Sequence, residues 1–186
     1  MLTAAAAALQ PVFCRSFVRC SKYSQRVREA ITELDLSVEI FPCPKGSIRH
    51  REMVRKLGSR EQFPFLVDPN TGISMYESRW LPTLLRAGRG MTLWKNSAKE
   101  PPPEKLELYS FENNPYARIV REVLCELELP YILQSVGQGS GRAKLLLELS
   151  GSYKVPYLVD PNTGMESGQY KKIIAYLVQT YSIATT

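Results

Sequence analysis

The chain has 186 residues, of which 44% are hydrophobic and 23% charged, as in ordinary globular domains. No window offers the roughly 18 apolar residues that a membrane span needs, so the composition excludes a transmembrane helix. The net charge of +6 arises in residues 1–95, which carry 15 Lys and Arg against 8 Asp and Glu. These cations are scattered without interleaved aromatic residues, which favours a solvated face over a nucleic-acid partner.

The N-terminal 28 residues contain no acidic side chain, are rich in Ala and include five Lys or Arg. This composition is typical of an organelle transit peptide. We expect a transit segment at residues 1–10 and a chloroplast location, with the mitochondrion and the cytoplasm as alternatives. The other interpretation of this region is a first strand followed by a basic loop.

Four cysteines and a single histidine are present, and no two cysteines form a CxxC pair. The spacing therefore predicts neither a disulfide framework nor a metal site. Cys43 and Cys125 are expected to be small packing residues. His50 is expected on the exposed side of a helix.

The clearest succession of elements lies in the second half of the chain. Residues 105–111 alternate like a strand, 116–128 have helical periodicity, and 130–136 form a second strand. Ser140 can cap a helix that Gly151 ends. A strand at 155–160, a Pro-Asn-Thr-Gly turn, a shortened return strand at 165–167 and a helix at 169–181 complete the order βαβαββα.

The first half repeats this pattern. The segment that begins at Tyr23, YSQRVREAITELDL, recurs 93 positions later as YARIVREVLCELEL, and KGSIR recurs at the same interval as QGSGR. FPFLVDPNTG likewise recurs as VPYLVDPNTG. We therefore predict an α/β chain of two duplicated units: a first domain at 11–94, a Pro-rich extended linker at 95–104 and a second domain at 105–186. Residues 79–94 do not match the closing helix of the second unit, so the first unit is expected to be incomplete.

This order, with Pro opening the third strand, resembles the thioredoxin fold and, within it, the glutaredoxin-like N-terminal domain of glutathione transferases. The segments CPKGS, FPFLVDPNTG, MYES, VREVLCELELPY and VPYLVDPNTG together resemble a plant, chloroplast-targeted family that carries two such domains in tandem. The resemblance extends from about Tyr23 to Tyr181.

The resemblance implies a cis peptide bond before Pro64 and before Pro156. Such a bend turns the backbone N–H and C=O groups of Phe63 and Val155 toward a thiol peptide such as glutathione, which can pair with them as an added strand. The alternative is that each Pro only opens a buried strand.

The resemblance also implies that Glu77 and Ser78 receive the γ-glutamyl ammonium and carboxylate of glutathione, the latter at a helix N-terminus. The alternative is a simple helix cap. In the second unit Gln169 and Tyr170 occupy this place, and Tyr170 is a poor substitute for a capping hydroxyl.

Redox-active members of such families carry a thiolate at the start of the first helix, with CPFC-like spacing. The repeat aligns this window with residues 21–24 and 114–117, and neither contains Cys. Cys20, one position upstream, and the hydroxyl of Ser21 are the remaining candidate catalytic groups.

Two functional hypotheses follow. The first is a glutathione-linked oxidoreductase or transferase that uses Cys20 or Ser21, with glutathione as co-substrate and no metal. The second is a binding module that holds a thiol peptide or a thiol-containing protein without turnover, which the missing CxxC motif favours.

Overall fold

The computed structural model describes residues 12–15, 22–76 and 93–183. The expected transit segment, and most of the segment where a closing helix of the first unit would fall, lie outside these ranges. Within them, no helix is both long enough and apolar enough to cross a membrane.

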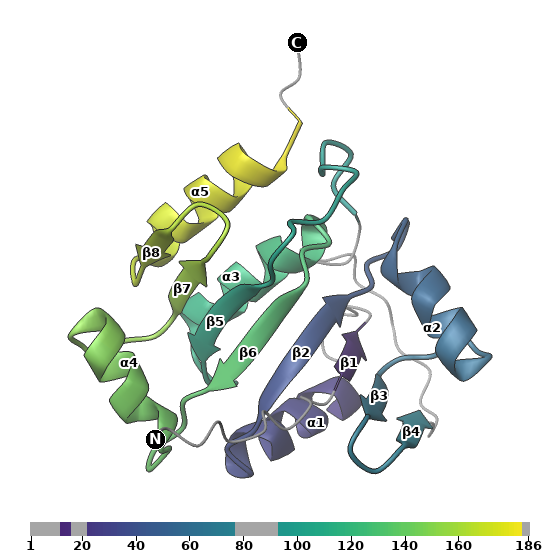
Figure 1. Ribbon diagram of the computed structural model, residues 1–186, viewed down its shortest axis with the longest axis horizontal. Helices are drawn as coiled ribbons and strands as arrows, with labels where there is room; N and C mark the ends of the chain where they lie inside the picture. The colour runs from purple at the N-terminus through teal and green to yellow at the C-terminus, as the bar shows by residue number, and fades with distance from the viewer. Residues whose placement is uncertain (1–11, 16–21, 77–92, 184–186) are drawn as a thin grey trace, which may run out of the picture.

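The described part of the chain repeats one succession of elements (Figure 1). The first unit contains β1 (Val12–Arg15), α1 (Lys22–Glu33), β2 (Ser37–Pro42), α2 (His50–Gly58), β3 (Phe65–Asp68) and β4 (Ile73–Tyr76). The second contains β5 (Leu106–Ser110), α3 (Pro115–Glu126), β6 (Tyr131–Ser135), α4 (Arg142–Ser150), β7 (Tyr157–Asp160), β8 (Met165–Ser167) and α5 (Tyr170–Tyr181). The predicted α/β thioredoxin-like fold is confirmed.

All eight described strands belong to one sheet, in the order β4-β3-β1-β2-β6-β5-β7-β8. Within each unit the first two strands are parallel, as β1 with β2 and β5 with β6, because a helix crosses over between them. The units join where β2 runs antiparallel to β6, from the pair Ser37–Gln134 to the pair Ile40–Tyr131. The two units thus share a continuous sheet (Figure 1).

Helices cover both faces of this sheet. One face carries a hydrophobic cluster that joins residues of α1, α3 and α5, among them Ile31, Leu124 and Ile173, to the strands. On the opposite face Val54 of α2 packs near Phe65, and Leu146 of α4 packs near Tyr109 and Tyr157. Successive side chains of a strand therefore pack against helices on opposite faces of the sheet.

The two repeated Asp-Pro-Asn-Thr-Gly turns have the predicted geometry. Asp68 and Asp160 each accept a bond from the backbone N–H two residues ahead, at 2.9 Å. The glycine that ends each turn adopts a φ near +70°, which side chains disfavour. Asp160 is fully buried and also accepts bonds from the hydroxyls of Tyr176 and Tyr181 on α5.

A buried carboxylate of the second unit holds the start of α2 in the first. Glu128, which is 0% exposed, follows α3 with a positive φ of 53°. Its carboxylate accepts bonds from the Ser47 hydroxyl and from the backbone N–H groups of Ile48, Arg49 and His50, at 3.0–3.2 Å for the three amides. An anion is favoured here because the first N–H groups of a helix have no partner within it.

The same contact occurs in the opposite direction. Asp35, 93 positions before Glu128, also has a positive φ, of 50°. Its carboxylate accepts a bond from Ser140 at 2.5 Å and pairs with Arg142 at 3.1 Å. Ser140 and Arg142 lie 93 positions after Ser47 and Arg49. We call these paired contacts the reciprocal lock; they explain why the acid and the GSxR motif both recur in the sequence.

The reciprocal lock corrects one prediction. His50 does not lie on an exposed face but is buried, and its Nδ1 lies 2.6 Å from the carbonyl oxygen of Pro42. Burial lowers the pKa of His50, and the nearby Arg49 lowers it further; the bond to Pro42 and the Glu128 carboxylate oppose this shift without cancelling it.

The segment that leads from the end of the expected first domain into the expected linker at 95–104 is bonded to both units. The backbone N–H of Leu93 donates to Lys45, that of Trp94 to Glu126, and that of Ala98 to Tyr181, at 2.8–3.0 Å. This segment therefore lies against the C-terminal ends of α3 and α5.

Candidate functional site

The peptide bonds Phe63–Pro64 and Val155–Pro156 are both cis in the structure. Each proline is buried and directly precedes β3 or β7, the strand next to an edge of the sheet, whereas Phe63 and Val155 are only partly buried. Part of the surface of each of these two residues is therefore accessible to solvent.

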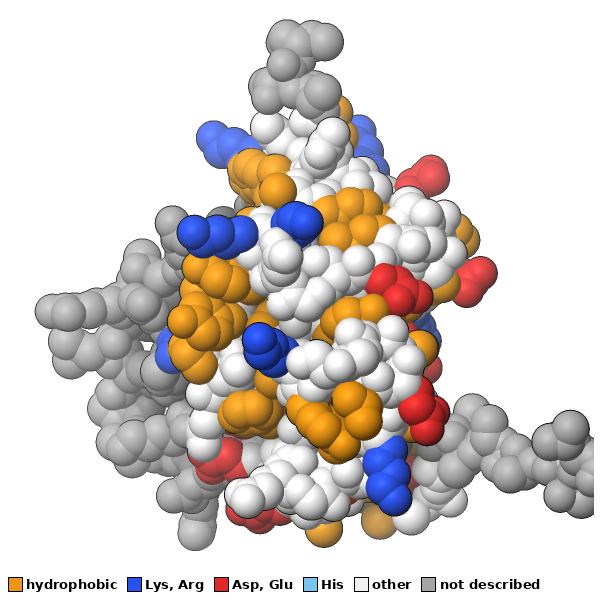
Figure 2. Space-filling model, turned by 90° about the vertical axis from the view of Figure 1, so that its left-hand side faces the viewer, with side chains coloured by type: hydrophobic (Ala, Val, Ile, Leu, Met, Phe, Trp, Pro, Cys, Tyr) orange, Lys and Arg blue, Asp and Glu red, His pale blue; other side chains and the backbone are white. Residues whose placement is uncertain are grey.

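A groove of about 430 Å³ opens beside the second of these bonds. The face that includes α4, α5 and β8 shows several patches of hydrophobic side chains with Lys and Arg between them (Figure 2). The groove is lined by Phe111, Asn114, Tyr116, Tyr153, Lys154, Val155, Pro156, Gly168 and Tyr170. Its walls thus come from the start of α3, the segment before β7 and the start of α5.

Asn114 connects α3 to the bend at Val155. Its Oδ1 accepts a bond from the backbone N–H of Ala117 at 2.8 Å, which caps α3, with Pro115 in the first turn. Its Nδ2 donates to the carbonyl oxygen of Val155 at 3.3 Å. One acceptor position of this carbonyl is therefore occupied from within the protein, and a second lone pair remains for a ligand.

Aromatic rings form much of the groove. The rings of Tyr116 and Tyr170 lie 4.8 Å apart between centroids with planes tilted by 31°. Tyr116 is 49% exposed and Tyr153 60% exposed. Tyr157 lies beneath Gly168; burial and a bond to Glu166 raise the pKa of Tyr157 to about 12, so its hydroxyl stays protonated at neutral pH.

A family model described as "Glutathione S-transferase, N-terminal domain" matches residues 17–88 and 108–184. The chain belongs to this family. Searches of curated proteins and of solved structures find no match.

The residue that caps α3 in this family member is Asn114. Asn114 stands at the first position of the window where the redox-active relatives considered above carry a thiolate. A carboxamide does not ionise and is not a nucleophile, so Asn114 cannot perform thiol exchange. The exclusion of a dithiol mechanism in this window rests on the sequence, since residues 114–117 contain no Cys.

The start of α5 also departs from the Glu-Ser motif. Its N-cap residue, Gln169, makes no side-chain capping bond, and the backbone N–H of Gln169 donates to the Ser167 hydroxyl at 3.2 Å. Tyr170, the first residue of α5, instead packs its ring against that of Tyr116, with the planes tilted by 31°.

Of the first unit's candidates, the structure places only Phe63 and Pro64. The guanidinium of Arg51 lies 5.2 Å from the centroid of the Phe63 ring, at cation–π distance. The other candidates of this unit lie outside the described residues: Cys20, Ser21, Glu77 and Ser78. The two cysteines whose side chains are described, Cys43 and Cys125, are buried as predicted.

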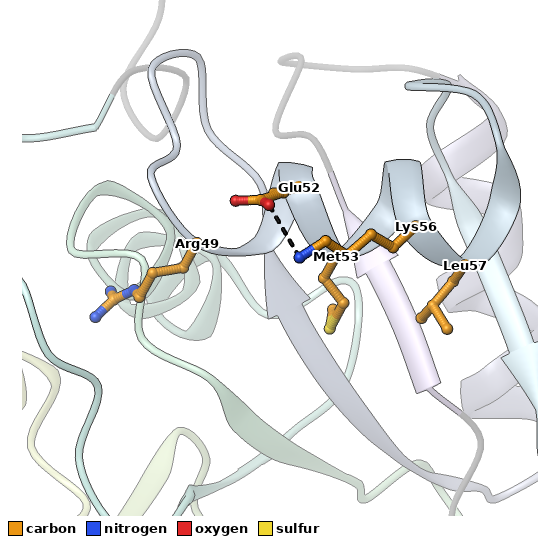
Figure 3. A pocket seen from close by; sticks show the side chains of 5 residues that line it. All are labelled: Arg49, Glu52, Met53, Lys56 and Leu57. Carbon is orange, nitrogen blue, oxygen red and sulfur yellow. Dashed lines mark ion pairs between the residues drawn. The ribbon is translucent and has the colours of Figure 1, made fainter.

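A second pocket lies along α2 and is lined by Arg49, Glu52, Met53, Lys56 and Leu57 (Figure 3). Lys56 pairs with Glu52 at 2.9 Å, and Arg49 donates to the carbonyl oxygen of Glu128 at 2.6 Å, so both cations of this lining have protein partners. Among the described residues no group of three or more His, Cys, Asp or Glu side chains is arranged to hold a metal ion. The groove at Val155 is therefore the stronger candidate site.

Sequence reasoning identified Val155 and Pro156 but missed Phe111, Tyr153 and Lys154 as lining residues. Tyr153 and Lys154 directly precede Val155, so the bend itself was an available signal. The bond between Asn114 and Val155 had no such signal, because it joins residues 41 positions apart.

Proposed function

We propose that the protein binds glutathione or a related thiol peptide by hydrogen bonds along the main chain of Val155. It holds this ligand without forming a covalent bond to it. The observation that carries this proposal is Asn114, a non-nucleophilic side chain bonded to Val155 at the position of the family's thiolate. The rest of the groove supports it, since Val155 is only partly buried and lines the groove beside aromatic side chains, which suits an extended peptide.

Calorimetric titration with reduced glutathione tests the proposal. Gly168→Leu is the blocking variant: a Cβ at Gly168 makes only ordinary contacts, with Tyr157 at 3.5 Å and the Pro156 carbonyl oxygen at 3.9 Å. Because Gly168 lines the groove, we expect the longer side chain to occupy it, and circular dichroism verifies that the variant is folded. We expect binding by the wild type and at least about tenfold weaker binding by Gly168→Leu, equivalent to roughly 1.4 kcal/mol.

The matched control is Leu34→Ala, at a site 68% exposed beyond the end of α1. It should bind like the wild type. Equal affinity of Gly168→Leu and the wild type would contradict the location, and no binding by the wild type would contradict the function.

A glutathione-linked oxidoreductase or transferase activity of the first unit is the second candidate. It is favoured by Glu77 and Ser78, which match the family's Glu-Ser pair. It is also favoured by Ser21, the first residue of the aligned thiolate window, and by Cys20 one position upstream. Disulfide-reductase and conjugation turnover should be measured on the wild type and on the variant Cys20→Ala/Ser21→Ala. Turnover that disappears in the double variant would support this activity; turnover that survives would exclude both nucleophiles.

We also propose that residues 1–10 direct import into the chloroplast, on the basis of the acid-free, Ala-rich and basic N-terminus. A fluorescent fusion of residues 1–28 in plant cells should colocalise with plastids. A mitochondrial or cytoplasmic signal would contradict the proposal.

A further inference from the structure

The lining of the groove at Val155 is mainly aromatic and carries positive but no negative charge. Of its lining residues, four are aromatic and Lys154 is the one with a charged side chain. Lys154 is exposed, so its ammonium is accessible to a ligand carboxylate. No carboxylate side chain belongs to the lining.

Free glutathione fits this lining only in part. Its γ-glutamyl end carries an ammonium, and an ammonium bound out of water needs a negatively charged or strongly accepting partner. In the first unit Glu77 could supply that partner, whereas the second unit offers Gln169, which is neutral and exposed. The γ-glutamyl head therefore gains little at the start of α5.

The aromatic rings offer a different recognition surface. Tyr116 and Tyr170 stack, and the exposed rings of Tyr116 and Tyr153 belong to the same lining as Val155. A ligand ring can pack against such rings in offset or edge-to-face geometry, which strengthens binding beyond the area that it buries. Tyr153 and Lys154 directly precede Val155, so an aromatic ring and an ammonium group lie in one short segment next to the proposed main-chain contact. A ligand that pairs with Val155 can therefore place a ring and a carboxylate of its own against this segment.

We propose that the groove selects a cysteine-containing peptide segment with an aromatic residue next to the cysteine and a carboxylate nearby, in preference to free glutathione. The ligand's main chain lies along Val155, its aromatic ring packs on Tyr116 and Tyr153, and its carboxylate pairs with Lys154. This inference rests on the proposed function and specifies its ligand.

The test uses four probes and calorimetry on the full chain. The probes are reduced glutathione and three blocked peptides without a free ammonium: acetyl-Cys-Phe-Glu-amide, acetyl-Cys-Gly-Glu-amide and acetyl-Cys-Phe-Gln-amide. We expect the Phe-Glu peptide to bind about two- to tenfold more tightly than the Cys-Gly-Glu peptide and than glutathione, which is the range of one aromatic contact. Its advantage over the Phe-Gln peptide should be about two- to fivefold, which is the range of one exposed ion pair.

Variants assign each preference to a side chain. Tyr116→Ala and Tyr153→Ala should each reduce the preference for Phe over Gly, and Lys154→Gln should remove the preference for Glu over Gln. Leu34→Ala should leave all four affinities unchanged. Circular dichroism verifies that each variant is folded. Because Tyr116 and Tyr153 are replaced in separate variants, the test remains valid even if one of the two variants does not fold.

The outcomes distinguish a failure of the ligand class inferred here from a failure of the proposed function. If glutathione binds as tightly as the Phe-Glu peptide, or if the tyrosine variants keep the full preference for Phe, the ligand class is wrong while the proposed function stands. If none of the four probes binds, the proposed function and this inference both fail.

Discussion

At the scale of single residues, Asn114 determines what the groove can do. Its side chain caps α3 with one atom and bonds to Val155 with the other. Because this position lies at a helix N-terminus, a thiol placed there would experience the dipole that lowers thiol pKa values in the redox-active relatives.

Asn114→Cys should therefore create a reactive thiolate with a pKa at least about one unit below the ordinary value of about 8.5. The measurement is the rate of reaction with Ellman's reagent as a function of pH. Leu34→Cys, at an exposed position away from the groove, is the matched control. Equal thiol pKa values in the two variants would show that α3 does not activate this position.

The sequence predicted the geometry of this site unevenly. Val155 and Pro156 were identified because a ten-residue segment recurs, and the absence of Cys from the aligned window was visible by inspection. The contact of Asn114 with Val155 could not be predicted, since local patterns carry no information on which side chain fills a bend 41 positions away.

At the scale of elements, the reciprocal lock attaches a helix of each unit to the other unit. Its two halves differ in burial: Glu128 is 0% exposed and accepts bonds from three backbone N–H groups, whereas the Asp35 side chain is 38% exposed. Desolvated charge-assisted bonds contribute more than solvated ones, so the halves should differ in energy.

Glu128→Gln should lower the free energy of unfolding by about 2 kcal/mol, because it removes the charge that satisfies the start of α2. Asp35→Asn, which keeps a residue type that tolerates positive φ, should cost less than about 1 kcal/mol. Urea denaturation measures both. Equal losses in the two variants would contradict the role assigned to burial.

His50 provides a pH-dependent test of the same region. Its pKa is lowered by burial in the folded protein, so the unfolded chain binds the proton more readily. Neutral His50 therefore contributes its full share to the free energy of unfolding at pH values above the pKa of an unfolded His, about 6.5. As the pH drops below that value, the free energy of unfolding falls by at most about 1.4 kcal/mol per pH unit. His50 is the single histidine of the chain, so in His50→Gln the decline between pH 7 and pH 5.5 should largely disappear. A decline that persists unchanged would assign it to carboxylates.

The prediction for His50 failed for a physical reason. Helical periodicity shows which side chains lie on one face of α2, but the partner that buries the start of that helix is a carboxylate 78 positions away. The repeated GSxR motif was visible in the sequence, and its function was not, because motif and acid lie in opposite units.

At the scale of the whole molecule, one sheet and one hydrophobic cluster cross the junction of the units. Ile31, Val38 and Ile40 of the first unit belong to the same cluster as Leu108, Tyr131 and Leu133 of the second. The order of elements was predictable from the repeat, but the edge-to-edge pairing of β2 with β6 was not, because periodicity identifies strands without their neighbours.

This continuity predicts cooperative unfolding. Ile40→Ala, at a residue 2% exposed and paired with Tyr131, should cost about 2–5 kcal/mol and shift a single transition for both units. Circular dichroism and tryptophan fluorescence should give coincident curves. Two separated transitions would mean that the units unfold independently.

The most direct test of the central claim is amide chemical-shift mapping of the ¹⁵N-labelled full chain during titration with reduced glutathione. Binding along the bend before β7 predicts that the amide signals of Val155, Tyr116 and Tyr170 shift in a saturable manner, and that Gly168→Leu suppresses these shifts. Saturable shifts confined to other parts of the chain, or no shifts at millimolar glutathione, would contradict the account.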